Sequence, residues 1–296
     1  DQGIGRILRA LKKTGQYENT LILFLQDNGG CAEEFGSQGK VRPPRGERPD
    51  GEPLGPDEVQ TRLVPKFTRD GWPVRRGHGV MPGPPDTYLA YGREWANVSN
   101  TPFRLYKHWV HEGGISTPLI AHWPAGIDRS GEYERQPGHV IDIMATCCDV
   151  AGANYPEEYN GNEITPLEGQ SLRPAFRGKD MPDRAIYFEH EGNRAIRKGR
   201  WKLVAKGARG DWELYDMQDD RSELNDLADD KPELVKELAG QWEDFARRAN
   251  MIPWPYAGEY SPLSDKTRFE LEQGDALPRR KSPHVAGKSF TITADV

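Results

Sequence analysis

The fold is decided by the stretch TLILFLQDNGG at residues 20–30, an apolar run that is followed by three polar residues and two glycines. A continuous apolar run bounded by turn residues is typical of a strand buried on both faces. The residues in front of it predict a helix, because Ile4, Ile7, Leu8 and Leu11 recur at helical spacing. A helix, a short loop and a buried strand form half of a βαβ unit.

Asp27 and Asn28 stand directly after this strand and offer one charged and one neutral oxygen. Ligands gather at the carboxyl ends of strands in open α/β sheets, and Gly29-Gly30 allows the chain to turn so that both side chains face one ion. Oxygen ligands suit Ca²⁺ or Mg²⁺ rather than Zn²⁺. The same residues also form an ordinary turn, so a metal site and a purely structural turn are both open.

A second candidate segment is KHWVHEGG at residues 107–114. Lys107 is a cation near a glycine turn, where it could neutralise an ester oxygen or a departing oxygen; a solvated surface lysine is the alternative. Glu112 is expected to be a salt-bridge partner or a group that supports the site from behind. His108 and His111 lack the spacing of a metalloprotease zinc motif, so we expect them to pack or to line a cleft.

Residues 33–106 are rich in Gly, Pro and Arg and predict a long loop. A loop of this length inside a compact domain is usually disordered or functional. Aromatic residues in its second half favour a cleft wall. Within it, His78 is a candidate for lining the cleft and contacting substrate, with an exposed loop position as the alternative.

The pattern changes after residue 180. Short strand-like runs separated by Gly and charged residues predict an antiparallel sheet, at residues 185–190, 195–197, 201–205 and 212–215. The stretch Asp230–Glu233 reads as a capping box, and the helix after it carries an apolar stripe expected to cover the sheet. The stripe consists of Leu234, Leu238, Trp242 and Phe245.

The predicted fold class is therefore α/β: part of a mixed, mostly parallel sheet flanked by helices, plus a small C-terminal antiparallel sheet packed by a helix. We expect an α/β unit at residues 1–180, a sheet-and-helix subdomain at 181–250, and an extended tail at 251–296. The last eight residues alternate like a strand that leads into a further β domain.

Composition narrows the function classes. Hydrophobic residues make up 35% and charged residues 29% of the 296 residues, and the net charge is −6. This balance argues against a general nucleic-acid surface, and no apolar run has the length of a membrane span. The chain begins in a helix without a signal peptide, so we expect Asp1 to be an internal point of a longer protein.

Taken in order, these stretches resemble the sulfatase family of the alkaline-phosphatase-like superfamily. The resemblance rests on residues 19–30, 107–124, 142–146 leading to 151–152, and 212–216, and residues 91–107 are similar to the arylsulfatase branch. It covers nearly all of residues 1–250 and corresponds to the later half of the family. Residues 1–180 would then be the later half of the catalytic domain, with 33–106 as its cleft loop.

By this resemblance, Asp27 and Asn28 would be two ligands of a single Ca²⁺, and Lys107 would contact the sulfate or the departing alkoxide. The family's nucleophile is a hydrated formylglycine made from Cys or Ser, followed by Pro or Ala at +2 and Arg at +4. None of the three cysteines fits this pattern. The nucleophile and the paired early aspartates of the calcium site are therefore expected upstream of Asp1.

The resemblance implies a fragment of a sulfuric ester hydrolase that is inactive in isolation and whose parent acts on aryl or carbohydrate sulfates. Relatives of this kind are commonly periplasmic or secreted. We expect the isolated chain to contain an incomplete central sheet with an unguarded edge, and we expect Asp27 and Lys107 to converge.

Three alternatives stay open at this point. The first is a phosphodiesterase or phosphatase of the same superfamily with two zinc ions, against which Asn28 argues because it favours one hard metal. The second is a non-catalytic module that binds sulfated glycans through the basic and aromatic residues between 75 and 104. The third is an α/β domain in which the Asp-Asn turn is only structural.

Overall fold

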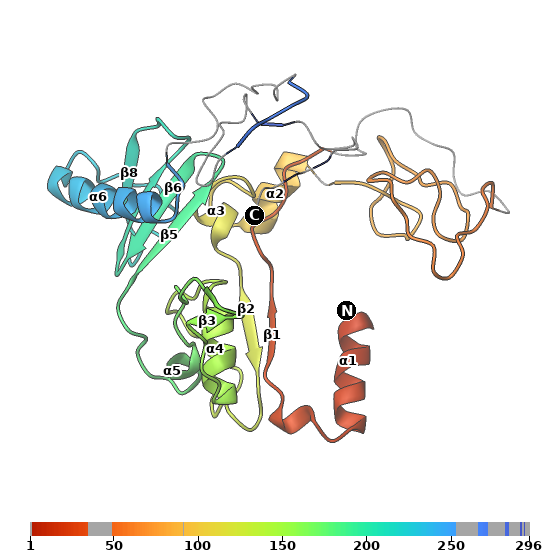
Figure 1. Cartoon of the computed structure of the whole chain (residues 1–296), viewed down its shortest axis with the longest axis horizontal. Helices are drawn as coiled ribbons and strands as arrows, with labels where there is room; N and C mark the ends of the chain where they lie inside the picture. Colours follow the sequence, from red (N-terminus) through yellow and green to blue (C-terminus); the bar gives the residue numbers. More distant parts are fainter. Residues whose placement is uncertain are drawn as a thin grey trace.

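The computed structural model describes residues 2–34, 49–90, 92–252, 266–271, 282–283, 291 and 293. Figure 1 shows the C-terminal sheet with its covering helix at one side, the strand pair β1–β2 below it, and the segment 49–90 at the opposite side. The site segments described below lie where the strand pair meets the C-terminal sheet.

The N-terminal residues form the predicted helix. The helix α1 (Gln2–Lys13) and the short helix η1 (Tyr17–Asn19) lead into the strand β1 (Ile22–Leu25). None of the α1 residues is buried, and the Ile7 side chain is 60% exposed. Figure 1 shows α1 on the opposite side of β1 from β2, so the described part of the chain leaves its apolar stripe uncovered.

The strand β1 pairs with β2 (Leu119–His122) in an antiparallel two-stranded sheet, with Ile22 opposite His122 and Leu25 opposite Leu119. The sequence predicts a mostly parallel sheet, and this pair departs from that expectation. The physical reason is that an apolar run specifies burial but not the direction of its neighbour. Antiparallel pairing has a consequence for the site, because the end of β1 and the start of β2 lie at the same edge.

The expected burial of β1 on both faces is wrong for this chain. Phe24 lies opposite Ile120, so the two side chains share one face of the pair. Phe24 is 43% exposed and Ile120 is 59% exposed, because no described helix packs over this face. The two-stranded sheet agrees with the expectation of an incomplete sheet.

The segments between the strands hold the remaining short elements. Within the long connection from β1 to β2 lie α2 (Gly92–Asn100) and α3 (Glu112–Ile115). After β2 come α4 (Asp142–Ala151), the two-residue strands β3 (Glu158–Tyr159) and β4 (Asn162–Glu163), and α5 (Arg173–Phe176). Gly152 ends α4 in the left-handed conformation with φ of 63°, which glycine adopts without a steric penalty.

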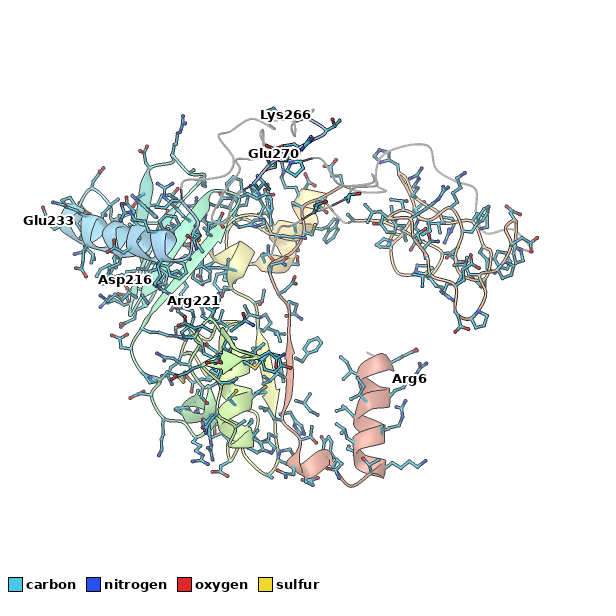
Figure 2. All side chains as sticks on the ribbon, in the orientation of Figure 1. Arg6, Asp216, Arg221, Glu233, Lys266 and Glu270 are labelled. Atoms are coloured by element: carbon cyan, nitrogen blue, oxygen red, sulfur yellow. The ribbon has the colours of Figure 1, made fainter. Side chains whose placement is uncertain are left out.

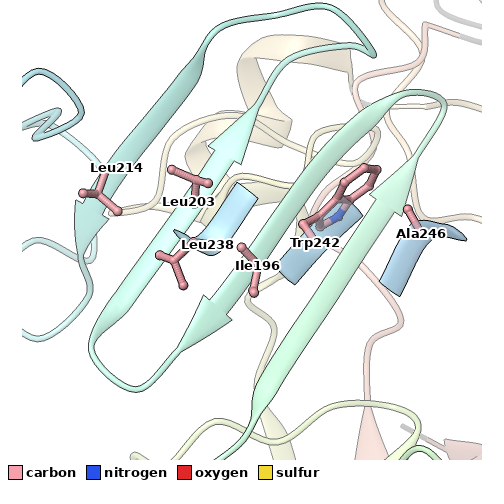
Figure 3. Close-up of a cluster of buried hydrophobic side chains, with 6 residues drawn as sticks. All are labelled: Ile196, Leu203, Leu214, Leu238, Trp242 and Ala246. Atoms are coloured by element: carbon pink, nitrogen blue, oxygen red, sulfur yellow. The ribbon is translucent and has the colours of Figure 1, made fainter. Parts of the chain in front are cut away.

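The predicted C-terminal sheet and covering helix are confirmed. The sheet has the order β5 (Ala185–His190), β6 (Asn193–Lys198), β7 (Trp201–Ala205) and β8 (Trp212–Asp216), with every neighbouring pair antiparallel. The helix α6 (Pro232–Arg248) covers one face. Figure 3 shows the resulting apolar core, which consists of Ile196, Leu203, Leu214, Leu238, Trp242 and Ala246.

The opposite face of this sheet is buried as well. Val110, which precedes α3, packs there against Ala195, Val204, Tyr215 and Met217. Successive strand residues point to opposite faces, so β7 sends Leu203 toward α6 and Val204 toward α3. The C-terminal sheet therefore supports the residues that lead into β2.

One expectation for the C-terminal region is wrong, and two others lie mostly outside the described residues. The capping box at Asp230–Glu233 is wrong, because Lys231 occupies the N-cap position of α6 and its side chain makes no capping hydrogen bond. The predicted strand at residues 289–296 lies outside the described residues, apart from Thr291 and Thr293. Most of the predicted tail at 251–296 lies outside them too.

In the described part of the chain, no helix combines the length and the apolar character that crossing a membrane requires.

The core beneath α6 should dominate the stability of the C-terminal subdomain. Replacing Leu238 with Ala removes a side chain that is 1% exposed and should lower the free energy of unfolding by about 2–5 kcal/mol. Leu224→Ala is the matched control, because that leucine is 76% exposed and its loss should cost less than about 0.5 kcal/mol. Urea unfolding of both variants measures the difference, and equal effects would contradict this assignment of the core.

Candidate functional site

Two backbone hydrogen bonds join the segment after β1 to the segment before β2. The N–H of Gly29 donates to the carbonyl of Gly114 at 2.9 Å, and the N–H of Lys107 donates to the carbonyl of Gly30 at 3.0 Å. The two stretches singled out from the sequence are therefore neighbours in space. We call this contact the glycine junction.

The glycines of the junction are required by close packing of backbone on backbone. A Cβ atom on Gly29 would lie 1.8 Å from the carbonyl oxygen of Gly113, which no side chain could tolerate. A Cβ on Gly113 would lie 2.2 Å from the Arg104 carbonyl oxygen, and one on Gly114 would lie 1.9 Å from that of Trp109. The chain needs glycine at these positions because backbone approaches too closely for a side chain.

Asn100, at the end of α2, bridges the junction and was not singled out by the sequence analysis. Its Oδ1 accepts the N–H of Gly30 at 2.8 Å, and its Nδ2 donates to the Leu105 carbonyl at 2.9 Å. One amide side chain thus holds the segment after β1, at Gly30, against the segment before α3, at Leu105. No local pattern marks this role, because the partners lie 70 and 5 residues away in the sequence.

Asp27 and Asn28 lie directly before the junction. Asp27 is exposed and Asn28 is half-buried. Neither side chain has a hydrogen bond or an ion pair with another described residue. Their oxygens are therefore free to bind a cation, and an all-oxygen donor set fits a hard ion such as Ca²⁺.

Lys107 lies on the other side of the junction and lines a cavity of about 490 Å³. Its side chain is exposed, and its ammonium group has no partner among the described residues. The cavity is lined by Cys31, Ala32, Glu33, Arg93, Tyr106, Lys107, His108, Trp109, His190 and Glu191. Both ends of the predicted loop 33–106 contribute to it.

The remaining predicted site residues are placed differently from Lys107. Asp27 and Asn28 do not line this cavity, whereas Cys31 and Ala32, a few residues further along the chain, do. His78 is exposed and is not among the lining residues. The last residue of β5, His190, and the first residue of the turn after it, Glu191, also line the cavity, and neither was predicted from the sequence.

Glu112 forms a buried ionic cluster that ties α3 to the C-terminal sheet. The Lys202 ammonium donates to Glu112 Oε1 at 3.0 Å and lies 2.8 Å from Glu223 Oε1. All three side chains are almost completely buried. Arg221, which Figure 2 labels next to the C-terminal sheet, reaches Glu112 Oε2 at 3.3 Å. Glu112 is therefore a salt-bridge partner, one of the two roles expected for it.

Positive charge decides the ionisation of Glu112. Burial by itself raises the pKa of this carboxyl, but the nearby Lys202 ammonium outweighs burial, so the pKa lies below its ordinary value. The Glu112 N–H donates to Glu223 Oε2 at 2.9 Å, so the cluster also holds the backbone at the start of α3. The glycines that contact Gly29 follow immediately in the chain.

A second buried group links the same segment to β8. His111 is fully buried, and its Nε2 lies 3.2 Å from Glu213 Oε2. The Tyr215 hydroxyl donates to that same oxygen at 2.6 Å. The hydrogen bond with His111, helped by Tyr215 and opposed by burial, lowers the pKa of Glu213 to about 2. The packing role expected for His111 agrees with this position.

Comparison with known families gives two matches. The profile of the family described as Sulfatase matches residues 1–153, more than half of the chain. The profile described as N-sulphoglucosamine sulphohydrolase, C-terminal, matches residues 103–247. Together they cover the glycine junction, the cavity residues and the C-terminal sheet.

Curated relatives of the chain are also named as sulfatases. An uncharacterized sulfatase of Schizosaccharomyces pombe is 28% identical over 86% of this chain and 43% of its own length. An arylsulfatase of Klebsiella aerogenes is 30% identical over 62% of this chain and 34% of its own length. The chain thus spans less than half the length of these curated relatives.

Among solved structures, the chain is similar to one from a study of the metabolism of multiple glycosaminoglycans by Bacteroides thetaiotaomicron. The TM-score is 0.51 at 21% identity, over 83% of this chain and 42% of that chain. At this identity the likeness shows the fold alone, and it supports the α/β class.

The close approach at the junction predicts that Gly29 cannot be replaced. Gly29→Ala should lower the free energy of unfolding by about 2 kcal/mol or more, because the added methyl group overlaps the Gly113 carbonyl. Gly3→Ala is the control, since a Cβ there meets nothing within 4 Å and should stabilise α1 by about 0.5–1 kcal/mol. Urea unfolding checks both, and a neutral Gly29→Ala would contradict the close backbone contact.

The lowered pKa of Glu213 predicts a pH dependence of stability. A carboxyl with a folded-state pKa of about 2 against an ordinary 4.5 stabilises the fold above pH 4.5 and loses this contribution as the pH falls toward 2. Glu213→Gln should therefore be less stable at pH 7 and lose stability less steeply between pH 5 and 2. Unfolding curves across this range measure the effect. Glu52→Gln, at an exposed position, should keep the steep acid dependence.

Proposed function

The chain belongs to the sulfatase family, and we propose that it forms part of a sulfuric ester hydrolase. In this proposal Asp27 and Asn28 supply part of the metal site. Lys107 supplies a cation that contacts the sulfate ester. The carrying observation is the glycine junction, in which Lys107 and the Asp27-Asn28 pair flank two backbone hydrogen bonds. Residues separated by almost eighty positions in the sequence are thereby joined through Gly30.

The metal in the proposal is a single Ca²⁺ ion. Asp27 and Asn28 fit it, because their oxygens are hard donors and engage no other described side chain. Two residues supply only part of the six to eight oxygens that Ca²⁺ takes, so the remaining ligands must come from other residues or water. When bound, the ion would reduce the repulsion between an anionic ester and a nucleophile.

Lys107 supplies charge on the substrate side. Its ammonium group is exposed at the cavity and is not paired with any described carboxylate, so it is available to an anion. Its backbone is fixed by the bond to Gly30, which keeps the root of the side chain in place. Lys107 would bind a sulfate oxygen and balance the negative charge on the departing oxygen.

The nucleophile in this proposal is a formylglycine located upstream of Asp1. Two observations support this placement. The chain resembles the family, and none of its three cysteines is followed by Pro or Ala at +2 and Arg at +4, the pattern in which the family forms formylglycine. The isolated chain should then hydrolyse no sulfate ester, whether aryl or carbohydrate. Appreciable hydrolysis of an aryl sulfate by the purified 296-residue chain would contradict this part.

Lys107→Ala in the full-length protein tests the catalytic proposal. The substitution should lower kcat/KM for an aryl sulfate by about 10²–10³-fold, the usual cost of losing one group that stabilises developing negative charge. Lys236→Ala is the matched control, because it removes another exposed lysine, which lies on α6. Steady-state kinetics measure both, and equal activity of the two variants would refute the role of Lys107.

Calcium titration tests the metal proposal separately from activity. The chain should bind Ca²⁺ weakly, with a Kd of roughly 1 mM, since it provides an incomplete ligand set. Asp27→Asn should weaken binding further, and Asp57→Asn, at an exposed position in the segment 49–90, should leave it unchanged. Isothermal titration calorimetry gives both values. Binding that is insensitive to Asp27→Asn would place the ion elsewhere.

A further inference from the structure

A cluster of two histidines and a glutamate lies outside the Asp27–Asn28 pair. His108 precedes α3, whereas His190 and Glu191 stand at the turn between β5 and β6. One ligand atom of each residue lies within 4.8 Å of the others. Two of the three come from a β-hairpin and the third from a distant segment, so tertiary folding alone brings them together.

The cluster is held by a buried asparagine. Asn193 is 2% exposed, and its Nδ2 donates to the His108 carbonyl at 3.0 Å and to the His190 carbonyl at 2.9 Å. One amide group therefore fixes the backbone of both histidines. The hairpin turn is closed as well, because the Gly192 N–H donates to Glu189 Oε1 at 3.1 Å. The cluster is thus built on a rigid element rather than on a free loop.

The side chains themselves are accessible. The His108 side chain is 42% exposed and that of Glu191 is 63% exposed. His108 Nδ1 lies 3.0 Å from Glu191 Oε2, and two ligands that each lie about 2.1 Å from a tetrahedral ion are about 3.4 Å apart. A small movement would let both atoms bind one metal ion. The His190 ring, whose centroid is 5.6 Å from that of His108, supplies the third ligand.

We propose that His108, His190 and Glu191 form a binding site for a divalent transition metal, with Zn²⁺ as the expected ion. Two imidazole nitrogens and one carboxylate oxygen are a donor set that suits Zn²⁺ and disfavours Ca²⁺. Three protein ligands leave a position for water or for an oxygen of a bound molecule. This site is separate from the calcium site proposed at Asp27 and Asn28.

The location of the cluster gives the ion a role. All three residues line the cavity that Lys107 also lines. A divalent cation there would add positive charge beside the Lys107 ammonium and would offset the carboxylates of Glu33 and Glu191 in the same lining. The ion would therefore favour an anionic ligand in the cavity.

Metal analysis of the purified chain tests the proposal without any measurement of activity. After dialysis against Zn²⁺ and removal of free ion, elemental analysis should find one zinc per chain. His190→Gln and Glu191→Gln should each weaken zinc affinity by more than about tenfold, since removing a ligand should cost at least as much as removing a group that orients one. Asp27→Asn should leave zinc binding unchanged, which separates this site from the calcium site.

Two control variants sharpen the result. His78→Gln removes an exposed histidine outside the cluster and should retain zinc. Cys31→Ser removes the cavity thiol, whose thiolate form is a competing zinc ligand, and should retain zinc too. Circular dichroism establishes that each variant is folded. Because Glu191 is an exposed turn residue, its variant provides the test even where His190→Gln fails to fold.

Absence of zinc in the unaltered chain would overturn the proposal. Zinc that persists in folded Glu191→Gln and His190→Gln would overturn it as well, and so would zinc that is lost only in Cys31→Ser. Loss confined to the His190 and Glu191 variants would support it.

Discussion

The antiparallel pairing of β1 with β2 is the constraint on which the site depends. Because Leu25 lies opposite Leu119, the chain leaves β1 and enters β2 at one edge of the sheet. The Asp27-Asn28 pair and the residues before α3 are therefore carried to the same place. The glycine junction then fixes their separation, since backbone meets backbone with no room for a side chain at Gly29.

The C-terminal sheet is part of the site's support rather than an appendage. Successive residues of its strand β7 point to opposite faces of the sheet. Leu203 packs against α6, whereas Lys202 and Val204 face the segment around α3. A buried lysine is costly unless its charge is matched, and here Glu112 and Glu223 match it. The hairpin of β5 and β6 on the same sheet brings His190 and Glu191 to the cavity beside Lys107.

Residue spacing predicts a helix or strand correctly where the element depends only on residues close together in the sequence. The helical spacing of Ile4, Ile7, Leu8 and Leu11 predicts α1, and the short strand-like runs separated by Gly and charged residues after residue 180 predict the four antiparallel strands. The pattern failed where a partner decides the outcome. It assigned β1 to a sheet buried on both faces, yet Phe24 is 43% exposed, and it placed a capping box where Lys231 is the N-cap of α6 and makes no side-chain capping bond.

The sequence by itself determined α1, β1, the C-terminal strands, α6 and the family, and it marked Asp27, Asn28 and Lys107 as candidates, because these depend on residue types at fixed short spacings. It did not predict α2, which lies within the expected loop 33–106. Only the tertiary structure decided the direction of the β1–β2 pair, the burial of Lys202 against Glu112, and the meeting of His108 with His190 and Glu191. These contacts join residues eighty or more positions apart, and no local preference encodes which distant segment a side chain will meet.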